Sequence, residues 1–275
     1  MSKLKGTEKK LAAPEVLDAV LGAFTRSRGL VSLAVVLAGF LVATILILLS
    51  GRNPAGIYWS ILQVVTGWDV WNGRFNVRYI GEWITLSMPL ILCGLSMAFA
   101  ARTGLFNIGA EGQYIVGLTA AQFIALLGPQ VPGLSWLLAL VAAVVAGASW
   151  GAIVGFLKAR YHVSEVVATI MLNYVAFYLS RILTLRIPGA STYRTQPFPP
   201  EALLDSPFLR ALTRGSRLNE GIWFTLAAVL VFWFIMEKTR LGFSLRATGL
   251  NREAARASGI PVRRSITTAM AIAGA

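Results

Sequence analysis

The chain has 275 residues, of which 56% are hydrophobic and 13% are charged. Soluble domains carry roughly 25% charged residues, so this composition excludes a disordered chain, a coiled coil and an ordinary cytosolic enzyme. The 25 lysines and arginines outnumber the 12 acidic residues, but they lie mostly between apolar runs, which indicates membrane topology rather than a nucleic-acid partner. We therefore predict an all-α, polytopic transmembrane helix bundle.

Cysteine and histidine are nearly absent from the chain. Cys93 lies inside an apolar run, and His162 is the single histidine. A disulfide framework or a Cys/His metal site needs several such residues. We therefore expect no disulfide bond, no metal site and no cofactor.

Six apolar runs approach the roughly 20 residues that a helix needs to cross a hydrocarbon core. They are residues 29–51, 83–101, 113–128, 134–157, 163–180 and 221–236, and a seventh run begins at 266–275. The lysine-rich residues 1–28 form too long a lead for a cleaved signal peptide, so we expect the first span to stay in the mature protein.

The distribution of basic residues predicts the orientation. Sixteen lie in segments on the side of the N-terminus and nine on the other side, so the positive-inside rule places the N-terminus in the cytoplasm. Residues 1–28 are then a cytoplasmic tail and 29–275 the membrane domain. Loops 52–82 and 181–220 lie outside, and the basic loop 237–265 is cytoplasmic.

Small residues recur at every fourth position of the fourth span, at Ala143, Gly147, Gly151 and Gly155. Residues spaced in this way share one helical face, and a face of small residues lets another helix approach closely in lipid. We expect Gly147, Gly151 and Gly155 to serve helix packing rather than substrate handling.

The fifth span carries Glu165, Thr169 and Asn173 four residues apart, so the three polar groups form one stripe along the helix. Polar groups at membrane depth usually face a bundle interior or a water-filled cavity. Glu165 lies close enough to the helix end to be either a solvated interfacial residue or part of a pathway. Asn173 lies near mid-span and is a candidate for the pathway wall or for a hydrogen bond between helices.

The glycine-rich stretch 101–113 precedes a run that is short for a span, since residues 113–128 reach only about 24 Å as a helix. Part of the glycine-rich stretch is therefore expected at membrane depth, where irregular backbone is buried in protein or lines a cavity. We predict that Asn107, Glu111 and Gln113 lie near a pathway. The alternative is a short loop followed by a tilted or thin third span.

The polar segment 237–265 contains signals for a short helix. Asn251 is a suitable N-cap, Glu253 lies in the first turn, and Gly259 can adopt the left-handed conformation that ends a helix. A helix of about seven residues is marginal alone in water, so we expect it to lie against something else. A protein groove and anionic lipid headgroups both fit its flanking arginines.

Three segments together resemble a known family. The segment LRATGLNREAARASGI resembles the coupling helix of ABC importer permeases, and MAFAARTGLFNIGAEGQYIVG and EVVATIMLNYVAFYLS narrow the resemblance to the ribose / branched-chain amino-acid permease superfamily. Within it the chain looks most like permeases of nucleoside uptake systems. The resemblance covers roughly residues 80 to 275.

The resemblance implies partners and roles. The chain would pair with a second permease subunit and two cytoplasmic ABC ATPase subunits, receive substrate from an extracytoplasmic lipoprotein, contact membrane lipid and bind no nucleic acid. The helix that contacts the ATPase would include Asn251, Glu253, Ala254, Ala255 and Gly259. The stretch around Asn107 would line the translocation path.

The implied function is a permease subunit in the bacterial plasma membrane, with nucleosides as the expected substrate and sugars as the alternative. The chain has no G-x-x-x-x-G-K-[ST] phosphate loop, so ATP hydrolysis is expected in partner subunits. An ATP-independent carrier or channel would not need the capped helix in 237–265, and an intramembrane enzyme would need a catalytic cluster that the sequence does not offer. Permeases of this family continue for several more spans, so we also expect the chain to be the front part of a longer permease.

Overall fold

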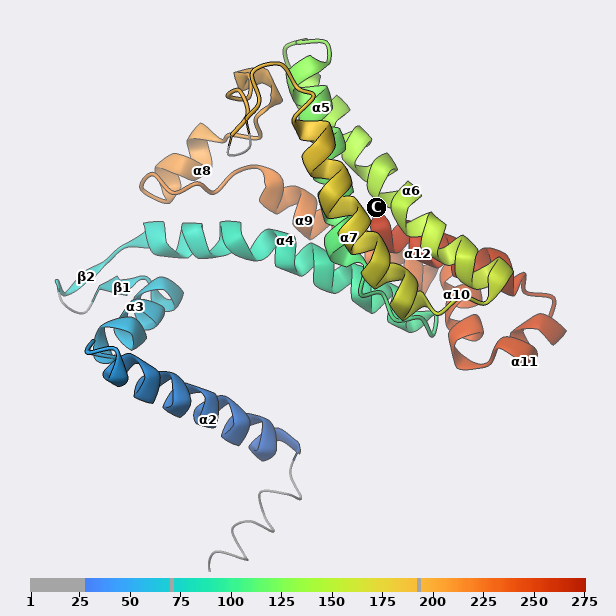
Figure 1. Cartoon of the computed structure of the whole chain (residues 1–275), viewed down its shortest axis with the longest axis horizontal. Helices are drawn as coiled ribbons and strands as arrows, with labels where there is room; N and C mark the ends of the chain where they lie inside the picture. Colours follow the sequence, from blue (N-terminus) through green and yellow to red (C-terminus); the bar gives the residue numbers. More distant parts are fainter. Residues whose placement is uncertain (1–27, 70–71, 192–193) are drawn as a thin grey trace, which may run out of the picture. The chain divides into compact units, whose positions relative to one another are not determined.

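The computed structural model describes residues 28–69, 72–191 and 194–275. The predicted cytoplasmic tail therefore lies outside the described residues, except for Arg28. The helices are α2 (Arg28–Leu49), α3 (Ala55–Thr66), α4 (Val77–Arg102), α5 (Ala110–Leu127), α6 (Ser135–Tyr161), α7 (Glu165–Thr184), α8 (Pro207–Leu212), α9 (Gly221–Lys238), α10 (Arg240–Leu250), α11 (Arg252–Ala257) and α12 (Val262–Gly274). A 3₁₀ turn, Pro200–Ala202, and one antiparallel pair, β1 (Trp68–Asp69) with β2 (Arg74–Phe75), complete the described elements (Figure 1).

The chain divides into two units, residues 1–63 and 64–275. Within the first unit, α2 packs against the beginning of α3 through Phe40 and Tyr58. The Tyr58 hydroxyl donates to the Phe40 carbonyl at 2.8 Å, and the two rings meet edge to face with centroids 5.7 Å apart. The segment between the first two predicted spans thus begins with a helix that packs against α2.

In the part of the chain that the structure describes, five helices are long and apolar enough to cross a membrane: α2 from Val31, α4, α6, α7 and α9. Their outward side chains are large and apolar, as at Leu49 and Leu90, which are 78% and 72% exposed in the isolated chain. An apolar surface of this extent needs lipid or protein to cover it. The predicted helical, polytopic class is therefore confirmed.

The predicted third span corresponds to α5, which is 18 residues long. It is more polar than those five helices, because Glu111, Gln113 and Gln122 lower its hydropathy. α5 packs against both α6 and α7, and these three helices lie side by side (Figure 1). Its amide side chains are accommodated by these neighbours rather than by lipid.

Gly147, Gly151 and Gly155 of α6 all lie against the backbone of α12. A Cβ atom added to Gly155 would lie 2.7 Å from the Cα atom of Thr267, and one added to Gly147 or Gly151 would overlap a carbonyl oxygen of α12. The predicted packing face of α6 therefore meets α12, a contact that depends on the absence of side chains at these three positions.

Replacing Gly151 with alanine is expected to destabilise the protein by about 1–3 kcal/mol, because its Cβ would overlap the Met270 carbonyl oxygen and force α12 away from α6. Gly94→Ala in α4 is the matched control, since a Cβ there meets nothing within 4 Å. Thermal unfolding of the two detergent-solubilised variants measures the difference. Equal stability of the two variants would show that α12 does not pack on this face.

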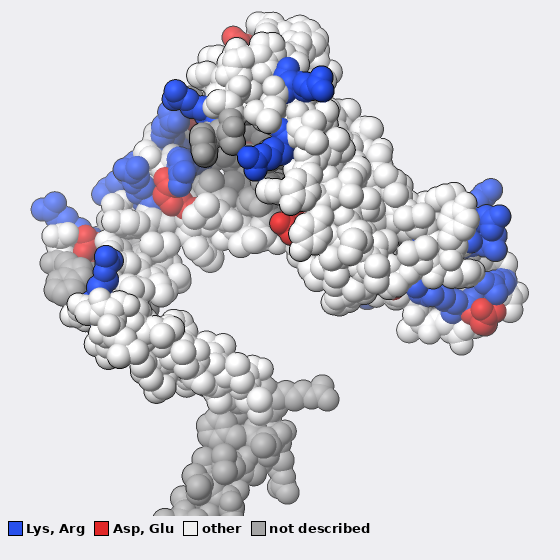
Figure 2. All heavy atoms as spheres, in the orientation of Figure 1, with Lys and Arg blue, Asp and Glu red and all other residues white. Residues whose placement is uncertain are grey.

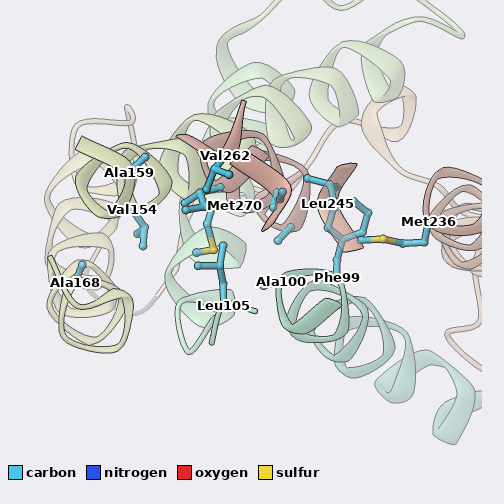
Figure 3. Close-up of a cluster of buried hydrophobic side chains, with 14 residues drawn as sticks. Phe99, Ala100, Leu105, Val154, Ala159, Ala168, Met236, Leu245, Val262 and Met270 are labelled. Atoms are coloured by element: carbon cyan, nitrogen blue, oxygen red, sulfur yellow. The ribbon is translucent and has the colours of Figure 1, made fainter. Parts of the chain in front are cut away.

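A buried apolar cluster joins the helices of the second unit at the end that holds α11. It includes residues from α4, α6, α7, α9, α10, α11 and α12. Figure 3 shows Leu245 of α10 beside Phe99 of α4 and Met236 of α9, while Met270 of α12 points toward Leu105. The polar helices α10 and α11 are therefore anchored in the same core as the spans.

The start of α4 and the helical content of the segment 237–265 differ from the sequence prediction. α4 begins at Val77 rather than at residue 83, because the Asn76 side chain caps it by accepting from the Arg78 amide; a search for uncharged runs could not include Arg78 and Glu82. The segment 237–265 holds two further helical parts besides α11, namely α10 and the start of α12. α10 is polar overall, so hydropathy gave no signal for it.

Candidate functional site

The connection between α4 and α5, residues 103–109, is non-helical, and every second residue of it is buried. Thr103, Leu105 and Asn107 are each at most 2% exposed. The chain turns back on itself here: α4 ends at Arg102, Gly104 has a φ of +71°, and α5 begins at Ala110. A buried turn of this kind has to satisfy its backbone polar groups within the protein.

Asn107 organises the inner part of this turn. Its Nδ2 atom donates to Ser96 Oγ at 2.9 Å and to Gln113 Oε1 at 3.0 Å, and its Oδ1 atom accepts from the Gly109 amide at 3.0 Å. The amide group thus connects α4, the turn and the first residues of α5. Asn107 and Gln113, which were both predicted to lie near a pathway, are buried and hydrogen-bond to each other.

Asn173 of α7 holds the same turn from the opposite side. Its Nδ2 atom donates to the Ile108 carbonyl at 3.1 Å, and its Oδ1 atom accepts from the Gly112 amide at 2.9 Å. Asn173 lies about 12 Å along the helix axis from Glu165, the first residue of α7. The turn therefore reaches about two helical turns inward from the end of the bundle.

Glu111 differs from the other polar residues of this region because its side chain is exposed. It lies in the first turn of α5, where a carboxylate complements the helix dipole. Phe106 and Tyr114, on either side of it in sequence, are also exposed. Glu111 is therefore exposed on the surface of the chain, whereas Asn107 and Gln113 are buried.

Glu165 pairs with Lys158 across the corner between α6 and α7. The Lys158 Nζ atom lies 2.5 Å from Glu165 Oε2, and the two side chains are 19% and 14% exposed. This partly buried ion pair links the last turn of α6 to the first turn of α7. Thr169, one helical turn further along, is fully buried and lies against Gly109 of the turn. The predicted polar stripe of α7 therefore begins at the ion pair with Lys158 and continues to residues that contact the buried turn.

α11 has the predicted caps. The Asn251 Oδ1 atom accepts from the amides of Glu253 and Ala254, both at 3.0 Å. Gly259 follows the helix with a φ of +81°. The helix is six residues long, and Ala255 is 4% exposed because it packs into the apolar cluster. The outward face of α11 is thus formed by Glu253, Ala254 and their exposed neighbours rather than by Ala255.

The corner between α10 and α11 contacts the buried turn directly. Gly249 lies against Arg102, Thr103 and Gly104 so closely that a Cβ atom at Gly249 would lie 2.9 Å from the carbonyl carbon of Thr103. Arg252 Nη2 also donates to the Gly104 carbonyl at 3.2 Å. The sequence could not predict this contact, because Gly104 and Gly249 belong to segments far apart in the chain. Nothing in the glycine-rich stretch 101–113 or in the segment 237–265 indicates that the two meet.

A second link holds the same end of the bundle together. Glu237, near the end of α9, accepts ion pairs from Arg246 of α10 at 3.0 Å and from Arg102 of α4 at 3.5 Å. Exposed ion pairs of this kind add little stability individually. They nevertheless fix α10 against the end of α4, which is where the buried turn begins.

Comparisons with known proteins identify the class. The pattern of the family described as branched-chain amino acid transport system / permease component matches residues 79–275, which include the turn, the corner and α11. The chain belongs to this family. It is thus a transport component and a multi-pass integral protein of the bacterial plasma membrane.

Individual relatives are similar over most of the chain. The guanosine ABC transporter permease protein NupP of Bacillus subtilis (strain 168) is 42% identical over 90% of this chain and 68% of its own length. The nucleoside ABC transporter permease protein NupB of Lactococcus lactis subsp. cremoris (strain MG1363) is 34% identical over 90% of this chain and 67% of its own. A glucose ABC transporter permease protein of Haloferax volcanii is 35% identical over 65% and 49%. No solved structure matches.

Proposed function

We propose that this permease subunit carries nucleosides across the plasma membrane as part of an ABC importer. The similarity to NupP and NupB, which extends over 90% of the chain, carries this proposal. Its partners are cytoplasmic ABC ATPase subunits, a second permease subunit and an extracytoplasmic substrate-binding lipoprotein. ATP hydrolysis takes place in the ATPase subunits.

The exposed carboxylate of Glu111 is our candidate for contact with the substrate. A charged group is costly where it faces lipid, so an exposed one in an apolar helix is best explained by a water-filled path. A carboxylate accepts hydrogen bonds from hydroxyl and N–H groups, both of which a nucleoside carries, and an aromatic ring such as that of Tyr114 can stack on a base. Asn107, Gln113 and Asn173 do not contact the substrate in this proposal. They fix the turn 103–109, which positions the start of α5 and with it Glu111.

The corner between α10 and α11 is our candidate for coupling to ATP hydrolysis. α11 exposes Glu253 and Ala254 and keeps Ala255 in the core. A force on α11 is passed to the turn through Gly249 and Gly104, whose backbones are in contact, and through Arg252. Closely packed backbones transmit displacement because neither side can yield independently.

Uptake of labelled guanosine by cells tests the proposed substrate. Cells that produce the complete transporter are expected to take up guanosine faster than cells that lack it, and unlabelled nucleosides, but not glucose, should compete. The glucose alternative is supported by a relative that matches a smaller part of both chains. Competition by glucose alone would contradict the nucleoside proposal and favour that alternative.

A further inference from the structure

A basic groove runs between the end of α6 and the start of α12. It is formed by Arg160, Arg263 and Arg264 together with Phe156, Thr267 and Thr268, and it encloses about 340 Å³. Arg263 and Arg264 also line a neighbouring hollow of about 770 Å³ toward α11. Figure 2 shows the wider gathering of Lys and Arg side chains at this end of the molecule. We propose that the basic groove binds the phosphodiester headgroup of an anionic phospholipid.

Within the described residues, no ion pair compensates the charges of the basic groove. The ion pairs among the described residues involve none of its three arginines. Arg160 instead lies over the Tyr161 ring, 5.6 Å from its centroid. Arg263 and Arg264 stand in the first turn of α12, which has no acidic residue, and a cation there opposes the helix dipole. An anion bound between them would relieve this unfavourable arrangement.

The position of the basic groove favours a lipid over a soluble anion. The last turn of α6 contains Arg160 and ends a membrane span, so the arginines lie at the level of the headgroups. One turn further into the span, Phe156 is 52% exposed and lines the groove, and Ile153 is exposed beyond it. Arginines at the interface with apolar side chains below them match a headgroup and the acyl chain attached to it.

Lipid retention by the purified complete transporter tests this proposal. After purification from mixed phosphatidylglycerol and phosphatidylcholine, native mass spectrometry counts the lipids that remain bound. The wild type is expected to retain more phosphatidylglycerol than phosphatidylcholine. A double variant, Arg263→Gln with Arg264→Gln, should retain at least about threefold less phosphatidylglycerol than the wild type. Arg263→Lys with Arg264→Lys keeps the charges and should retain most of it.

The matched control removes two charges elsewhere, by Arg181→Gln in the last turn of α7 with Arg186→Gln just after this helix, both at exposed positions. This control should retain lipid like the wild type. Equal loss in both double variants, or no loss in either, would overturn the proposal.

Two other results would assign the basic groove to a different occupant. Displacement of the lipid by soluble glycerol phosphate would indicate a free-phosphate site. Loss of ATPase subunits with unchanged lipid would place the basic groove at the interface with those subunits. Because no outcome depends on the transported solute, the test is independent of the proposed substrate.

Discussion

Replacing Asn173 with leucine is expected to lower nucleoside uptake at least about tenfold per inserted molecule. The change leaves the Ile108 carbonyl and the Gly112 amide without their partner, and an unpaired buried polar group costs about 1–3 kcal/mol. The turn between α4 and α5 would then leave its position, and Glu111 would move with it. Uptake in cells, normalised to the amount of protein in the membrane, measures the effect.

Tyr174→Phe is the matched control for this prediction, because it removes a hydrogen-bonding group from the next residue, which is exposed. It should leave uptake within about twofold of the wild type. Undiminished uptake in Asn173→Leu would mean that the position of the turn does not govern transport. Restoration by Asn173→Gln is not expected, because the longer side chain cannot reach both backbone groups from the same place.

Replacing Ala254 with glutamate should abolish assembly with the ATPase subunits. Ala254 is exposed on α11, and glutamate has a high helix propensity, so the helix itself is kept. The added charge and bulk would instead block the close approach of a partner to this face. Co-purification of the ATPase subunits with the tagged permease measures the loss, which should approach completeness.

The control for Ala254→Glu is the same substitution at Ala211, an exposed residue of α8, which is also six residues long. α8 packs near Met88, in the opposite half of α4 from the corner, so Ala211→Glu should leave ATPase binding intact. Retained ATPase binding in Ala254→Glu would show that the exposed face of α11 is not the coupling contact.

Local signals in the sequence predicted local structure well. Asn251 caps α11, and Gly259 adopts the left-handed conformation, because both effects depend on a few neighbouring residues. The proximity of Asn107 to Gln113 could also be expected from their spacing around a glycine-rich turn. The direction in which these amides point could not, because it depends on Ser96 and α7.

Contacts between distant segments escaped prediction. The hydrogen bond from Arg252 to Gly104 joins residues that are 148 positions apart, and the approach of Gly249 to the same turn has no counterpart in either motif. The family resemblance led us to expect Ala255 at the contact with the ATPase, yet Ala255 is buried in the core because α11 packs against α12. The ion pair between Glu165 and Lys158 also escaped prediction, because it depends on how α6 and α7 meet.

The central claim is that this chain forms the path of an ATP-driven nucleoside importer. The measurement that tests it most directly is guanosine accumulation in proteoliposomes that contain the purified complete transporter, with the substrate-binding lipoprotein on the side from which guanosine is supplied. We predict accumulation only when ATP is available to the ATPase subunits, and in proportion to the ATP hydrolysed. Guanosine entry at the same rate without ATP, or ATP hydrolysis with no guanosine transport, would contradict the claim.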